Sequence, residues 1–172
     1  MRYYTALYRP EYQRQGLEGK TMNRLIASVF CLATTVAVTN PSLSATLPKD
    51  ASELSGEEVR AMYAGKSAEW KSVRVYFAPD GSAKLVRKDK KGYGEGKWSV
   101  SGNQMCMTIT PVDLAKGKRD PIKDCYSWHK AGTKYFMRWS GDEGKADAFR
   151  DDEPSRLTAG DKVSKDFTAL KK

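Results

Sequence analysis

Apolar and polar residues alternate in short runs through the middle of this chain. An alternation with a period of two places successive side chains on opposite faces of a β-strand. The runs cover residues 73–77, 83–87, 96–100, 105–109, 123–129 and 134–139. They lie about 8–12 residues apart, and turns rich in Gly, Asn, Asp and Pro join them. We therefore predict a mainly β fold, an antiparallel meander that forms a curved sheet or a small barrel.

A short N-terminal helix is predicted before these strands. Ser55 lies three residues before Glu58, the spacing of a capping box, in which each of the two residues satisfies a free backbone amide at the helix start. The apolar stripe that follows at helical spacing consists of Val59, Met62 and Tyr63. Gly65 then comes where a helix ends in a left-handed residue. These signals predict a helix of two to three turns.

The first 45 residues differ in character from the rest of the chain. After Met22, residues 25–38 run for 14 positions without a charge, which is typical of the apolar core of an export signal. Small residues follow Pro41, and we predict cleavage near Ala45. The run is shorter than the roughly 20 residues that a membrane-spanning helix needs. Residues 1–21 show no periodicity, and we interpret them as an extension upstream of the true start.

The expected organisation is a leader (1–45, with 1–21 as the extension and 22–45 as the signal peptide), an extended lead-in (46–54), a single β-rich domain (55–151) and a C-terminal tail (152–172). Without the leader the chain keeps 127 residues and a formal net charge of +6. A chain of that size can bury one core without a metal or a partner. The tail lacks alternation, and we expect it to be loosely attached, with a short helix around residues 165–170.

Two cysteines remain once the leader is removed, Cys106 and Cys125. Outside the cytoplasm such a pair usually forms a disulfide. The bond also predicts a register, because cysteines that face each other across antiparallel strands lie close enough to be joined. The other facing pairs would be Met105 with Tyr126, Met107 with Asp124 and Ile109 with Ile122.

A family resemblance rests on several local strings. These are Leu54–Glu58, Tyr63–Lys66, Tyr76–Gly81, Gly96–Val100 and the spaced Cys106 and Cys125. On these residues, which cover most of 54–128, the chain resembles a family of short alphaproteobacterial envelope proteins catalogued as a domain of unknown function. The resemblance implies an exported protein with a single domain. It carries over no active site, because the family has none assigned.

Catalytic patterns are missing, so we predict a protein that is not an enzyme and needs no metal or cofactor. His129 is the single histidine, which excludes a multi-histidine metal site. Ser127 lies on the same strand and could serve as a nucleophile, but the sequence shows no relay of a base and an orienting residue around the two. No phosphate loop, dinucleotide fingerprint or nucleophile elbow is present. The acidic runs at 142–143 and 151–153 lack the spacing of a calcium loop, and we interpret them as solvated loop tips.

Two basic runs fall at predicted hairpin tips. The first contains Arg87, Lys88, Lys90 and Lys91, and the second contains Lys116, Lys118 and Arg119. Lysines at such positions keep a sheet soluble. If the two runs converge in space, they would attract anions. Outside the cytoplasm these anions would be lipid head groups, acidic polysaccharide or an acidic protein face, and nucleic acid is not an expected partner.

Aromatic side chains offer a second candidate surface. Trp98, Trp128, Tyr135 and Trp139 lie in the predicted strands. Packing in the core is the default interpretation for rings in a small sheet. The alternative is that one or two of them line a concave face, where aromatic rings bind sugars, peptides or apolar ligands.

The leading hypothesis is a periplasmic or secreted binding module that engages a component of the cell envelope. Membrane contact would be peripheral, or would occur through an uncleaved signal. One alternative is an inhibitor of a lysozyme or a protease, which would insert loop 111–121 into its target, with Pro111 and Pro121 stiffening the loop. A further alternative is an unrecognised hydrolase that uses His129.

Overall fold

The alternating runs form strands of an antiparallel sheet that has ten strands in all among the described residues. The structure is a computed structural model, and it describes residues 46–142, 144 and 148–172. The predicted leader, with the cleavage position near Ala45, lies outside the described residues. The residue pattern also predicts a shorter strand at 146–150, and part of this segment lies outside the described residues. Its described end contributes one isolated bridge, between Arg150 and Met137.

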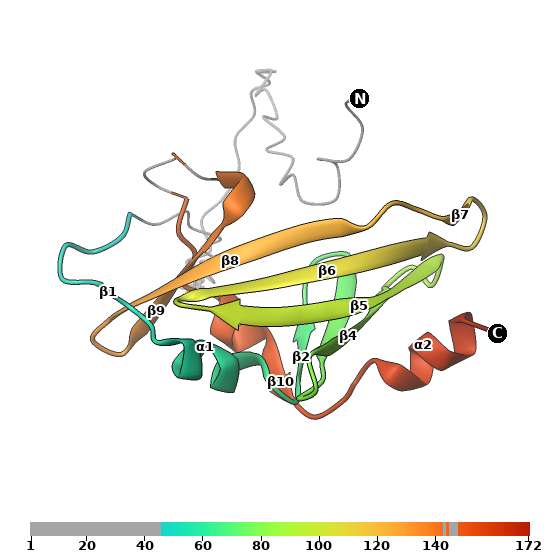
Figure 1. Ribbon diagram of the computed structural model, residues 1–172, viewed down its shortest axis with the longest axis horizontal. Helices are drawn as coiled ribbons and strands as arrows, with labels where there is room; N and C mark the ends of the chain where they lie inside the picture. The colour runs from blue at the N-terminus through green and yellow to red at the C-terminus, as the bar shows by residue number, and fades with distance from the viewer. Residues whose placement is uncertain (1–45, 143, 145–147) are drawn as a thin grey trace, which may run out of the picture. The chain divides into compact units, whose positions relative to one another are not determined.

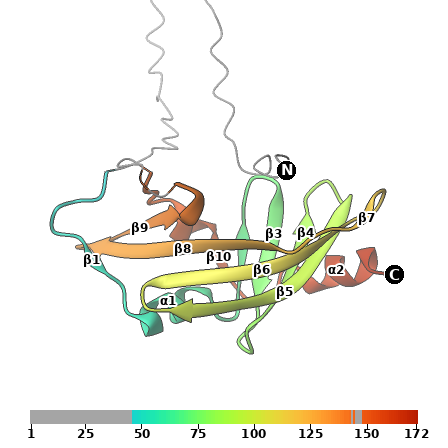
Figure 2. The same ribbon diagram turned by 45° about the horizontal axis from the view of Figure 1, so that its top comes forward.

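The elements have the following bounds: β1 Ser52–Glu53, α1 Gly56–Tyr63, β2 Lys66–Glu69, β3 Val73–Phe77, β4 Ser82–Arg87, β5 Gly92–Ser101, β6 Gln104–Asp113, β7 Gly117–Lys118, β8 Ile122–Ala131, β9 Lys134–Trp139, η2 Ser140–Asp142, η3 Glu153–Arg156, β10 Leu157–Ala159 and α2 Ser164–Leu170. The strands follow the order β1-β8-β6-β5-β4-β3-β2-β10, with β7 beside β6 and β9 beside β8. The long strands curve together as part of a half barrel (Figures 1 and 2). The predicted mainly β fold is therefore confirmed, as a curved antiparallel sheet.

The register between β6 and β8 agrees with the prediction from the cysteines. Cys106 and Cys125 form a disulfide, and their Cα atoms lie 4.0 Å apart. Along the same ladder Met105 faces Tyr126, Met107 faces Asp124, and Ile109 faces Ile122. The disulfide joins residues that face each other in this ladder, so it is compatible with a single register of the two strands.

The main core lies on the inner face of the sheet. Its centre is an aromatic cluster of Tyr63, Phe77, Trp98 and Trp128, all at most 3% exposed. The Tyr63 ring lies 5.0 Å from the Phe77 ring and 5.9 Å from the Trp128 ring, in edge-on contacts that favour aromatic pairs. Because Tyr63 belongs to α1, the helix closes one end of this core.

The helix itself begins as predicted. The Glu58 backbone N–H donates to Ser55 Oγ at 3.2 Å, and the Ser55 backbone N–H donates to Glu58 Oε2 at 2.8 Å, which completes the capping box. Gly65 follows with φ 71°, in the left-handed region. The cap and the glycine set the two ends of α1, so this helix was readable from the sequence.

The prediction that residues 152–172 form a loosely attached tail is wrong. β10 pairs with β2, and Leu157 faces Ala68. The predicted helix is present as α2, and its Phe167 packs with Val163 on Val86 in a second small core. The segment is bound because it buries apolar side chains of its own and completes the edge of the sheet. The β-rich domain therefore extends to the C-terminal helix.

Candidate functional site

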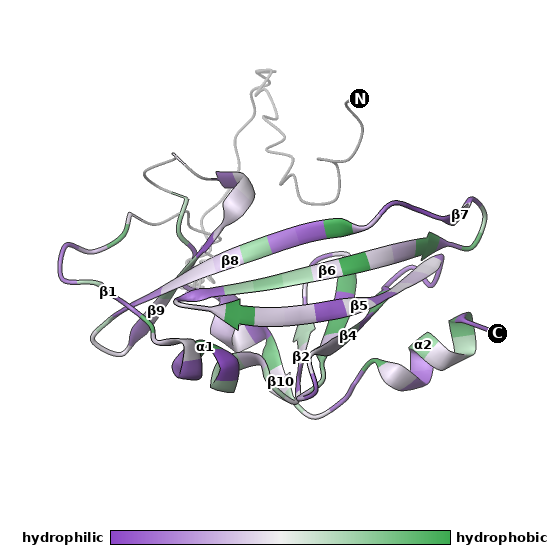
Figure 3. Ribbon diagram, in the orientation of Figure 1, coloured by the Kyte–Doolittle hydropathy of each residue, from purple (hydrophilic) through white to green (hydrophobic). Residues whose placement is uncertain are grey.

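The two basic runs meet at one end of the sheet. Gly92 at the start of β5 faces Asp113 at the end of β6. This pairing brings the loop before Gly92 and the loop after Asp113 side by side. The Leu114 backbone N–H donates to the Lys91 carbonyl oxygen at 3.0 Å and ties the two loops together. We call the group Arg87, Lys88, Lys90, Lys91, Lys116, Lys118 and Arg119 the basic tip. It lies at the β7 end in Figure 1, where Figure 3 shows hydrophilic chain.

Asp113 organises this tip. Its Oδ2 accepts a hydrogen bond from Arg87 Nη1 at 3.2 Å and lies 4.0 Å from Arg119 Nη2. Its Oδ1 accepts the backbone N–H groups of Ala115 and Lys116 at 3.0 and 3.2 Å. One carboxylate thus holds an arginine from each basic run and fixes the turn after β6. The arginines serve mainly to join the loops, which leaves the lysines to present charge.

The lysines of the tip are largely uncompensated. Lys88 pairs with Glu69 at 2.7 Å, and Asp89 pairs with Arg87. Within the described part of the chain, no ion pair involves the side chains of Lys90, Lys91, Lys116 and Lys118, and all four residues are exposed. Segments 87–91 and 113–119 carry seven positive side chains against two negative ones. The tip is therefore a concentrated positive surface that can bind anions.

Lys90 has a left-handed backbone conformation. Its φ is 59°, and it is the one non-glycine residue with positive φ among those described. This left-handed region favours glycine or asparagine, and a long side chain there costs free energy. The Lys91 backbone N–H bonds Asp89 Oδ1 at 3.0 Å. This bond, followed by the Arg87 guanidinium, lowers the pKa of Asp89. The turn therefore keeps a lysine at its apex where a glycine would fit more easily.

The four aromatic candidates do not converge on a surface. Trp98 and Trp128 lie in the core, and Trp98 Nε1 donates to the Ala78 carbonyl oxygen at 2.8 Å. Neither ring can face a ligand in this conformation, because neighbouring side chains cover both. Tyr135 and Trp139 lie on β9 and are more accessible, and Trp139 Nε1 donates to Asp124 Oδ1 at 2.8 Å. The prediction of core packing is thus confirmed for Trp98 and Trp128.

Ser127 Oγ and His129 Nδ1 are not hydrogen-bonded to each other in the described structure. Ser127 Oγ donates to the Arg138 carbonyl oxygen at 3.5 Å. His129 Nδ1 is buried and has no hydrogen-bond partner among the described residues. The His129 ring meets the Phe149 ring edge-on at 5.4 Å, and burial lowers its pKa. In the part of the chain that the structure covers, no three potential metal ligands gather in one place.

Glu153 is buried, so the prediction of a solvated loop tip is wrong for this residue. We expected a solvated loop tip, but the side chain is 1% exposed. Trp70 Nε1 donates to its Oε1 at 2.6 Å. Burial raises the pKa of Glu153 to about 7, against the opposing effect of the Trp70 hydrogen bond. Nothing in the acidic string 151–153 distinguishes the one carboxylate that turns inward, so this position could not be found from the sequence.

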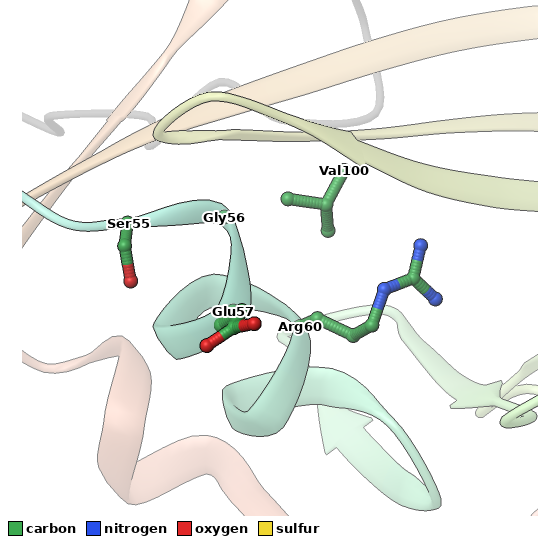
Figure 4. Close-up of a pocket in the computed structure, with 5 residues that line it drawn as sticks. All are labelled: Ser55, Gly56, Glu57, Arg60 and Val100. Carbon is green, nitrogen blue, oxygen red and sulfur yellow. The ribbon is translucent and has the colours of Figure 1, made fainter.

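An open hollow lies at the other end of β5, between this strand and α1. Its lining comprises Ser55, Gly56, Glu57, Arg60 and Val100 (Figure 4). The guanidinium carbon of Arg60 lies 5.4 Å from the centre of the Trp98 ring, over its face. The capping box already engages amides at the start of α1, so the helix start is not free to bind an anion. The hollow therefore has fewer groups available to bind a ligand than the basic tip has.

No helix among the described residues combines the length and the apolarity needed to cross a bilayer. Comparison with curated proteins gives no match, and neither does comparison with solved structures. A family model described as "Protein of unknown function (DUF995)" matches residues 27–166. The match spans most of the chain and agrees with the resemblance to a domain of unknown function seen in the local strings. The chain belongs to this family, DUF995.

Proposed function

We propose that the protein is a non-enzymatic, exported binding module that engages an anionic component of the cell envelope through the basic tip. The observation that carries the proposal is the convergence of two basic runs on one small surface. The Lys91–Leu114 backbone bond and the Asp113 carboxylate hold these runs together. A preformed cluster of cations binds anions more strongly than scattered cations do, because the potentials add within a Debye length of about 8–10 Å.

Two other observations support this role. The uncharged run at 25–38 is typical of an export signal, which would place the domain where anionic lipids and polysaccharides are abundant. Lys90 keeps a strained backbone conformation at the apex of the tip. Strain at an exposed position is commonly retained when the side chain has a role beyond folding.

The test uses the chain from residue 46 and isolated outer-membrane, peptidoglycan and polysaccharide fractions. We expect retention on at least one fraction at low salt and release at high salt, because salt screens the attraction. A variant in which Lys90, Lys91, Lys116 and Lys118 are replaced by glutamine should lose this retention. The control replaces Lys49, Lys97, Lys134 and Lys162, which are exposed, lie outside the tip and take part in no ion pair within the described residues.

Both variants lower the net charge by the same amount, so the comparison isolates the position of the charges. The tip variant should be released at a lower salt concentration than the control. Two results would contradict the proposal. One is no retention of the unaltered protein on any fraction at low salt, and the other is an equal loss in the two variants.

A further inference from the structure

A single apolar side chain stands out within the basic tip. Leu114 is 52% exposed, and the only other large apolar side chain exposed to a comparable degree in the described residues is Tyr135, at 39%. Leu114 follows Asp113 directly and precedes Lys116 by two positions. Its backbone is bonded to Lys91. An exposed leucine therefore lies between lysines that come from both loops.

The turn leaves Leu114 no place in the core. The Asp113 carboxylate binds the N–H groups of Ala115 and Lys116 and holds the chain in a tight turn immediately beyond the leucine. Opposite the leucine, across the ribbon, lies the exposed Lys91, whose carbonyl oxygen accepts the Leu114 backbone N–H. The leucine is thus held outward by the same interactions that assemble the tip.

We infer that the basic tip docks on an anionic lipid bilayer, with its lysines at the head groups and Leu114 inserted among the lipids. This inference rests on the proposed function and names its ligand. A bilayer offers both parts of the required chemistry: negative charge at the surface and an apolar layer a few ångströms below it. An acidic polysaccharide offers the charge without the apolar layer, so it would leave Leu114 in water.

The small size of the surface also favours a bilayer over a protein partner. The tip consists of two short loops, whereas a stable protein interface typically covers about 800 Å² on each side. A bilayer needs no shape complementarity, because lipids rearrange around the inserted side chain. Each lysine near an anionic surface strengthens binding by roughly fivefold. The resulting attachment is peripheral, reversible and sensitive to salt.

The first experiment measures sedimentation with vesicles. The chain from residue 46 is used, because it contains all the described strands and excludes the apolar run at 25–38, which could bind lipid by itself. We expect binding to vesicles of phosphatidylglycerol and phosphatidylcholine in equal parts, and none to phosphatidylcholine alone. Leu114→Ala should weaken this binding about fivefold, since part of one apolar side chain no longer enters the lipid. Tyr135→Ala, the matched control, should leave it unchanged.

The second experiment reads insertion directly. With Cys106 and Cys125 joined in a disulfide, Leu114→Cys supplies a thiol that can carry a polarity-sensitive fluorophore, and Tyr135→Cys supplies a control site. We expect the emission of the label at 114 to shift to the blue on anionic vesicles, while the label at 135 does not respond. Circular dichroism of every variant checks that the sheet is intact.

The outcomes separate this inference from the proposed function. Retention on a polysaccharide, peptidoglycan or protein fraction without vesicle binding overturns the lipid inference and leaves the binding module in place. Vesicle binding that is unaffected by Leu114→Ala, with the label at 114 still in water, overturns the insertion. Absence of binding to vesicles and to all envelope fractions overturns both proposals together.

Discussion

The two ends of the β5–β6 ribbon use the same pair of strands differently. At one end Trp98 faces Met107, and both side chains are buried in the core that α1 closes. At the other end Gly92 faces Asp113, and exposed lysines lie in the loop before Gly92 and in the loop after Asp113. The buried end contributes packing, whereas the basic tip contributes charge. If the tip binds anions as we propose, stability and binding depend on separate parts of one ribbon.

On β5, glycines take the place of core side chains between Trp98 and the basic tip. Gly92, Gly94 and Gly96 share the inner face of the strand with Trp98, because side chains alternate along it. At Gly96 a Cβ atom would lie 1.8 Å from the Thr108 carbonyl oxygen, so the two strands approach too closely for any side chain there. Toward the tip, β5 therefore has nothing to bury on this face.

The largest effect on stability is expected in the aromatic cluster. Trp128→Ala removes a fully buried ring and leaves a cavity, so the free energy of unfolding should fall by about 3–5 kcal/mol. Tyr135→Ala, a matched loss of an aromatic ring at an exposed position, should change it by no more than about 0.5 kcal/mol. Chemical denaturation measures both. Similar losses in the two variants would break the distinction between the buried end and the surface.

The next largest effect on the free energy of unfolding is expected from the disulfide. Its loop covers a sequence separation of 19 residues, for which loop-closure entropy gives about 3 kcal/mol. Replacing both Cys106 and Cys125 by serine should lower the free energy of unfolding by that amount, and reduction of the unaltered protein should match it. Retention on envelope fractions should survive under conditions where the variant stays folded. Loss of retention in a folded variant would show that the two regions are coupled.

The features that the sequence predicted are those set by local or covalent constraints. The capping box at Ser55 and Glu58 depends on residues three apart. The β6–β8 register follows from alternation together with one bond between two cysteines. In both cases few residues are involved, and their spacing leaves little choice of structure.

The features that escaped prediction depend on contacts between distant segments. β2 carries Ser67 and Ala68 rather than an alternating apolar run, and its partner β10 lies about 90 positions later, with Leu157 facing Ala68. The charges of the basic tip were visible in the sequence, but their convergence depends on how the ribbon folds. The exposure of Leu114 gave no signal, because one leucine in a polar loop looks like any other.

Glu153 should make stability depend on pH. Its pKa rises on folding from an ordinary value near 4.5 to about 7, so the folded state favours the protonated side chain. The stabilisation is present in full below pH 4.5 and is lost as the pH rises through 7. The free energy of unfolding should fall over this range by at most about 3 kcal/mol.

Glu153→Gln should remove this dependence, because the amide stays neutral and its oxygen can still accept the Trp70 hydrogen bond. His129 acts in the opposite direction, since its pKa is lowered on folding. The informative quantity is therefore the difference between the two proteins in denaturation series at several pH values. Equal pH dependence of the two would show that folding does not raise the pKa of Glu153. Stability would then not depend on the protonation of Glu153.

The smallest effect on stability is expected at the basic tip itself. Replacing Lys90, Lys91, Lys116 and Lys118 by glutamine removes exposed charges that repel one another, so the free energy of unfolding should change by less than about 0.5 kcal/mol. The strained backbone at Lys90 persists in this variant, because glutamine is no easier to place at positive φ than lysine. The same variant should lose retention on the envelope fraction. If the tip lysines stabilise the fold, the free energy of unfolding should instead fall by about 1 kcal/mol or more. In that case the tip would contribute to stability as the buried end of the ribbon does, and the two ends would not be separate in function.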